Sequence, residues 1–156
     1  MATINTFLEI DMLKPMFEGI SAGTINGELK KNVYFATLGT MDQFYIKWQV
    51  GSNQHEVSIY GDNLSLDFLN DVASTGGNVR LIASQETNPL GLVNFGTLLS
   101  DLHDIPFAGV YNTFLSSNEI DDVALLQNYL SKNDLIFAFG NIKGYAGHDT
   151  IILGLA

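Results

Sequence analysis

The sequence predicts an α+β fold, in which an antiparallel β-sheet meander carries helices packed on one face. The first observation is a clean alternation of apolar and polar residues from 44 to 50, which is typical of a strand with one buried face. The second is that shorter runs of this kind, separated by turn residues, surround it between 32 and 85. The third is a change to helical spacing after residue 92. Strands followed by helices are typical of an α+β domain.

Composition limits the classes of function. The chain has 156 residues, of which 46% are apolar and 15% charged, so we expect one globular domain with a sizeable core. The 17 acidic and 7 basic residues give a formal net charge of −10, which argues against nucleic acid or an anionic membrane surface as a partner. The absence of cysteine excludes disulfides, zinc–thiolate sites and cysteine nucleophiles.

The sequence gives no sign of a membrane span or of a cleaved secretory signal. No segment is long and apolar enough to cross a bilayer, so we expect no membrane insertion. The first residues have no basic region and no clean apolar run, and Glu9 and Asp11 appear early. Secretion would therefore need a route that leaves the N-terminus uncleaved.

Element by element, the spacing predicts a helix, then strands. Residues 5–20 carry apolar side chains at every fourth position, which predicts a helix that ends or kinks near Leu13, before Pro15. The glycine-containing turns that we expect to separate the following strands lie at 51–53, 61–63 and 76–77. The predicted strands lie near residues 33–35, 44–50, 57–59, 64–68 and 79–83.

Helices are predicted after the meander. The run from Leu92 to Leu102 has apolar residues at steps of three and four, and residues 110–115 form a second short apolar face. Ser116 and Glu119 have the spacing of a capping box. An amphipathic helix follows them and ends near Ser131.

The C-terminal stretch carries the most specific motif. Gly144, Gly147, Asp149 and an apolar residue at 151 follow the nonapeptide pattern of calcium-binding β-helices. Glycines permit the tight turn that directs backbone carbonyls and a carboxylate at one hard cation. Asp134 and the residues after it match the second half of another copy, without its glycines. The predicted calcium ligands are Asp134, Gly144, Gly147 and Asp149.

The spacing of the two copies leaves an alternative open. Asp134 and Asp149 are 15 residues apart, which is neither one nor two nine-residue turns. The alternative is a terminal strand or β-arc that keeps the motif as a vestige. We divide the chain into a globular body, 1–132, and a C-terminal segment, 133–156, within the same compact domain.

This C-terminal stretch resembles the start of an RTX calcium roll. The resemblance implies export by type I export machinery, through an uncleaved C-terminal signal, to an extracellular location. The acidity, the 15 glycines and the lack of cysteine agree with such export. It also implies that calcium outside the cell contributes free energy to folding.

The body resembles the secreted haemophores, which are haem-acquisition proteins exported by that route. The similar stretches are 93–96, 110–112, 115–117 and the helix through Leu130. The resemblance implies the fold and a haem site with a strand tyrosine that a nearby histidine hydrogen-bonds. Tyr45 and His55 flank the predicted hairpin, so we expect contact across it. The family's second axial histidine has no counterpart, because no histidine precedes His55.

The predicted function is an extracellular, non-enzymatic binding or structural module, stabilised by calcium. One alternative is a haem carrier, and another is a self-assembling surface or matrix subunit that forms homo-oligomers through sheet edges. A third is a small enzyme whose site combines residues distant in sequence. The chain has no G-x-S-x-G, P-loop or H-E-x-x-H motif that would favour the enzyme.

Overall fold

A computed structural model describes one sheet and two helices. The described residues are 3–11, 27–35, 39–69, 72–100, 102, 105–116, 118–129, 135–141 and 150–153. The elements are β1 (Thr3–Asp11), β2 (Gly27–Phe35), β3 (Gly39–Val50), β4 (Asn53–Leu69), β5 (Val72–Thr87), β6 (Val93–Ser100), β7 (Ile105–Pro106), α1 (Phe107–Leu115), α2 (Glu119–Tyr129), β8 (Leu135–Asn141) and β9 (Thr150–Leu153).

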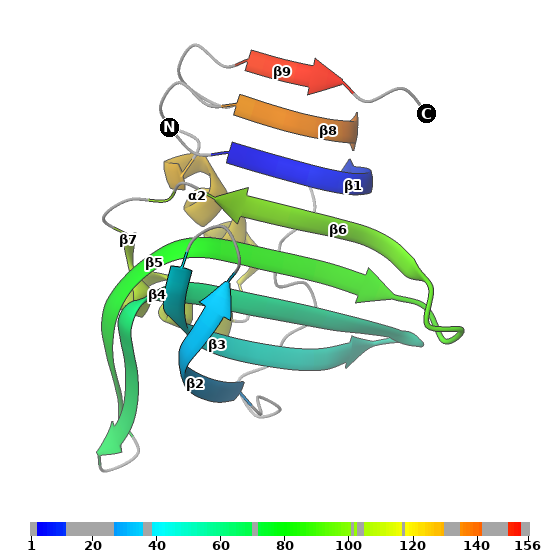
Figure 1. Cartoon of the computed structure of the whole chain (residues 1–156). Coiled ribbons are helices and arrows are strands. Elements are labelled where there is room, and N and C mark those ends of the chain that lie inside the picture. The colour runs from blue at the N-terminus through cyan, green and yellow to red at the C-terminus, as the bar shows by residue number, and fades with distance from the viewer. Residues whose placement is uncertain are drawn as a thin grey trace.

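All the described strands belong to one sheet (Figure 1). Its order is β2-β3-β4-β5-β6-β1-β8-β9, and the short β7 pairs with β5. The pairs from β2 to β5 are antiparallel and consecutive, which confirms the meander predicted for residues 32–85, and β6 continues it. The predicted hairpin is also confirmed, because Val50 pairs with Asn53 across a turn in which Gly51 has a φ of 60°.

The core forms where α1 packs against one face of the meander. The alternation in β3 places Phe44, Ile46 and Trp48 on this face, in one buried cluster with residues of α1. The ring of Phe44 lies 5.4 Å from that of Phe107 and 6.3 Å from that of Phe114, both in edge-to-face contact. The apolar positions of α1 recur at steps of three and four, so the predicted short helix is confirmed.

Two predicted helices are strands. Residues 3–11 form β1, whereas residues 12–20 lie outside the described residues. A four-residue spacing is also an even spacing, which in a regular strand places side chains on one face, so the pattern fits a strand as well as a helix. The run from Leu92 contains β6, which pairs with β5 on one side and β1 on the other. A strand in the middle of a sheet has a near-continuous apolar sequence, which periodicity does not distinguish from a helix.

The predicted turns at 61–63 and 76–77 are a bend within one long hairpin. The β4–β5 ladder shifts register after Tyr60 and again after Asp62, and both strands curve there (Figure 1). The two backbones approach closely at glycines. A Cβ on Gly61 would lie 2.1 Å from the Asn78 carbonyl oxygen, and one on Gly77 would lie 2.5 Å from that of Asn63. The predicted strands 57–59 and 64–68 are therefore one strand.

The start of α2 differs in detail from the predicted capping box. Asn118, rather than Ser116, is the capping residue: its Oδ1 accepts the N–H of Ile120 at 3.3 Å. Its side-chain amide donates to Asp121 at 3.2 Å. Ser116 instead ends α1, where its N–H bonds to the carbonyls of the last turn.

The C-terminal strands extend the same sheet through the N-terminal strand. β8 pairs parallel with β1, starting with Thr3 opposite Leu135, and β9 pairs parallel with β8. β8 thus lies between β1 and β9, and strands from both ends of the sequence share one side of the sheet (Figure 1).

Candidate binding face

The face of β3, β4 and β5 that lies opposite α1 is polar, and we call it the outer face. Odd-numbered residues of β3 point to it, and register pairs them with even-numbered residues of β4: Lys47 with Glu56, for example, and Glu56 in turn with Gln85. Its members are Gln43, Tyr45, Lys47, Gln49, Gln54, Glu56, Ser58, Tyr60, Leu81, Ala83 and Gln85.

The half-buried carboxylate of Glu56 lies at the centre of a hydrogen-bond network on the outer face. Gln85 donates to its Oε2 at 2.8 Å, and Gln54 donates to its Oε1. The Tyr45 hydroxyl also bonds to it. Burial raises the pKa of Tyr45 above its ordinary value, and the negative charge of Glu56 raises it further. The phenol therefore remains a donor, and side chains from three strands orient one carboxylate.

A second network continues along the same face. The amide of Gln43 lies 3.1 Å from the Ser58 hydroxyl and 3.0 Å from the Tyr60 hydroxyl. Leu81, which pairs with Tyr60, is only 1% exposed, so the outer face is closed to solvent there. Lys47 is exposed, so the Glu56 end is the accessible end.

Tyr45 and His55 lie on opposite faces of the sheet, so the predicted contact between them is wrong. Tyr45 pairs with Ser58, whereas His55 pairs with Trp48 on the core face. Ser58 and His55 are three residues apart in one strand, and an odd separation places two side chains on opposite faces. Haem binding by this chain stays a prediction, but Tyr45 and His55 do not form the tyrosine–histidine pair on which it was based.

His55 is part of a buried polar cluster on the core face. Its Nε2 lies 2.9 Å from Oε2 of Glu86, and its ring stacks on Trp48 with centroids 5.4 Å apart. Asn53 donates to the other oxygen of Glu86 at 3.0 Å. This cluster ties the β3–β4 turn to β5. The sequence alone could not predict this cluster, because it depends on the register that places His55 opposite Glu86.

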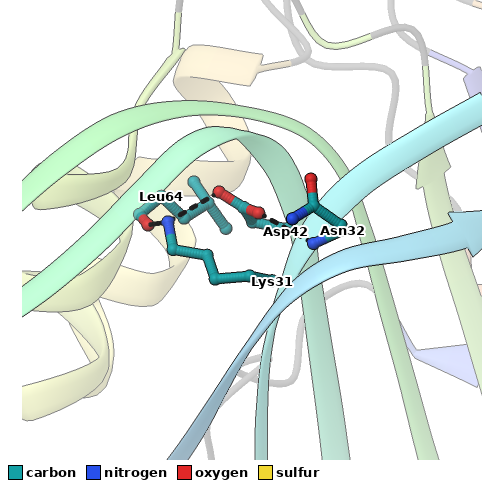
Figure 2. Close-up of polar contacts among 4 residues, drawn as sticks. All are labelled: Lys31, Asn32, Asp42 and Leu64. Carbon is teal, nitrogen blue, oxygen red and sulfur yellow. Dashed lines mark hydrogen bonds and ion pairs between the residues drawn. The ribbon is translucent and has the colours of Figure 1, made fainter.

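Another buried acid, Asp42, joins three strands near the other end of β3 (Figure 2). It forms an ion pair with Lys31 at 2.8 Å and accepts the backbone N–H of Asn32 at 3.1 Å. Lys31 also donates to the Leu64 carbonyl. Burial alone would raise the pKa of Asp42, but the bonds from Lys31 and Asn32 outweigh it and hold the pKa below its ordinary value. We assign this cluster a structural role, because it stabilises the β2 bulge at Asn32, whose φ is 56°.

The predicted calcium ligands Asp134, Gly144, Gly147 and Asp149 lie outside the described residues, and calcium binding stays a prediction. The flanking strands are described. Leu135 pairs with Thr150, an offset of 15 residues that differs from the nine-residue repeat of a calcium roll. Within the described ranges, no group of three or more His, Cys, Asp or Glu side chains is placed to hold a metal ion.

No protein-family model, curated protein or solved structure matches this chain. None of the helices in the described part of the chain has the length and apolar character needed to cross a membrane. The class of protein therefore rests on the fold and the face described above. It is a sheet-rich α+β domain, built on an antiparallel meander with a polar outer face.

Proposed function

We propose that this chain is a non-enzymatic binding module that acts outside the cell and holds a neutral, hydroxyl-rich ligand on its outer face. One observation carries the proposal: Tyr45, Gln54 and Gln85 fix the Glu56 carboxylate on the solvent side of the sheet. A fixed carboxylate accepts hydrogen bonds, and amide and phenol groups both donate and accept them, so together they match the needs of hydroxyl groups. A net charge of −10 disfavours polyanions.

The extracellular part of the proposal rests on the sequence. The RTX-like stretch around Asp149, the acidity and the lack of cysteine support export by a type I route. In this proposal, calcium stabilises the C-terminal segment after export.

Isothermal titration with soluble neutral oligosaccharides, such as a malto- and a cello-oligosaccharide series, tests the ligand class. We expect binding, and we expect Glu56→Gln to weaken it about tenfold or more. The substitution puts an amide N–H donor where the carboxylate oxygen accepts a hydrogen bond. The matched control is Asp67→Asn, the same carboxylate-to-amide change at an exposed residue of β4 that pairs with Ser74, away from Glu56. Absence of binding to every oligosaccharide, or equal affinity of the two variants, would contradict the proposal.

A thermal-melting titration tests the calcium part separately. We expect millimolar calcium, but not magnesium, to raise the Tm, and Asp149→Asn to remove the rise. Asp67→Asn, an exposed acid of β4, is the control. Equal melting in calcium and in chelator would show that the C-terminal stretch folds without the cation.

A further inference from the structure

The turn between β5 and β6, residues Asn88–Leu92, presents two leucines to solvent; we call it the β5–β6 tip. Leu90 is 83% exposed and Leu92 is 61% exposed. The tip projects from one end of the sheet (Figure 1). The other large apolar side chains exposed in the described part of the chain, Tyr34 and Ile120, lie on β2 and α2. The tip therefore gathers apolar surface at one projecting point.

The backbone of the β5–β6 tip satisfies its own donors. Oδ1 of Asn88 accepts the N–H of Leu90 at 2.9 Å and that of Leu92 at 3.0 Å. The N–H of Gly91 bonds to the Asn88 carbonyl, and the N–H of Asn88 bonds to the Leu92 carbonyl, both at 2.9 Å. The remaining residue, Pro89, has no N–H. Every backbone donor of the turn is thus bonded within it or missing, so entering a less polar medium leaves no unbonded N–H in this turn.

The sequence around the β5–β6 tip is free of charge. No Asp, Glu, Lys, Arg or His occurs from Thr87 to Ser100. The same holds from Trp48 to Gln54, which includes the neighbouring β3–β4 turn, and Gln54 pairs with Thr87. In a chain with a net charge of −10, the tip and the neighbouring turn thus carry no charged side chain, and Glu86, the acid next to this stretch, is paired with His55.

We propose that the β5–β6 tip makes a peripheral contact with a neutral, zwitterionic lipid surface, with Leu90 and Leu92 entering its interface. The saturated donors and the lack of charge remove the main costs of entering a medium of low polarity. An anionic surface would repel this acidic chain. A protein pocket fits less well, because two leucines cover far less than the roughly 1,000 Å² that a specific interface needs. The proposal does not depend on the ligand of the outer face.

Sedimentation with sucrose-loaded phosphatidylcholine vesicles tests the proposal. We expect the full chain to bind, and the double variant Leu90→Ser, Leu92→Ser to lose about tenfold in partition coefficient for each leucine removed. The matched control is Tyr34→Ser, Ile120→Ser, which removes two apolar side chains that are 72% and 74% exposed, and we expect it to leave binding unchanged. Circular dichroism melting checks that both double variants are folded.

Two further readouts identify the surface. Leu90→Trp places a fluorophore at the tip, and we expect brominated phosphatidylcholine to quench it more than Trp48 of the unsubstituted chain. Phosphatidylserine in the vesicles should weaken binding, because its charge repels the chain.

Three results would overturn the proposal. The first is no vesicle binding at millimolar lipid, which would assign the tip to a protein partner. The second is equal loss in the control variant. The third is self-association by light scattering that the leucine substitutions abolish while vesicle binding persists, which would assign the tip to a second copy.

Discussion

The bend in the β4–β5 hairpin makes a sharp prediction, because Gly61 and Gly77 stand where the two backbones approach closely. In Gly61→Ala the new Cβ would lie 2.1 Å from a backbone oxygen, more than 1 Å inside ordinary contact. Backbone atoms must move to admit it, so we expect a loss of about 2–3 kcal/mol of unfolding free energy, in the upper part of the range for overpacking. Gly77→Ala combines a 2.5 Å contact with a φ of +90°, so strain adds to overlap and the expected loss is about 2–5 kcal/mol.

Two other glycines separate these causes. Gly51 has a φ of +60° but nothing within 4 Å of its Cβ position, so Gly51→Ala isolates backbone strain, about 1 kcal/mol. Gly109 lies in α1 with open space around it, so Gly109→Ala should stabilise the chain by about 0.5–1 kcal/mol.

Urea denaturation followed by circular dichroism measures all four variants on one scale. The expected order of stability is Gly109→Ala, unsubstituted chain, Gly51→Ala, and then the two bend variants. The reasoning would be refuted if Gly61→Ala lost less unfolding free energy than Gly51→Ala. Steric overlap with a backbone atom would then cost less than a strained φ angle in open space.

Three further substitutions test the core, a helix cap and the buried ion pair. Phe44→Ala should cost about 3–5 kcal/mol in urea denaturation, and a loss below 1 kcal/mol would mean that α1 does not pack as described. Asn118→Ala should cost about 1 kcal/mol while Asn118→Ser costs little, and equal losses would argue against a capping role. Asp42→Asn should cost about 1–3 kcal/mol at pH 7. Because the folded pKa of Asp42 lies below its ordinary value, its contribution is present above about pH 4 and lost as pH falls through the folded value, so stability measured against pH should fall less steeply in Asp42→Asn than in the unsubstituted chain. Equal slopes would contradict this.

The meander could be predicted from sequence because its strands have one polar face and one apolar face. This makes the alternation of polar and apolar residues visible around Trp48. β1 and β6 could not, because apolar residues at even spacing or in a near-continuous run fit a helix and a central strand equally well. Long-range pairing decided between them: Ile4 and Ile82 both pair with Leu99, and no local pattern records such pairs.

The candidate site shows the same limit. Tyr45 could be singled out from its place on a strand, but its partner could not, because side-chain parity across a hairpin depends on turn length. The two-residue turn at Gly51 sets Tyr45 opposite Ser58 and leaves His55 on the other face. Glu56 had no motif to mark it, since its role comes from donors on three strands.

The position of β1 inside the sheet has a consequence for the timing of folding. β1 is synthesised well before one of its two neighbours, β8, which begins at Leu135. Contacts so far apart along the chain form slowly, because a long loop must close before they yield any stabilisation. A nascent chain therefore keeps one edge of β1 open until β8 has been synthesised, and a chaperone or an export channel has that interval in which to engage it.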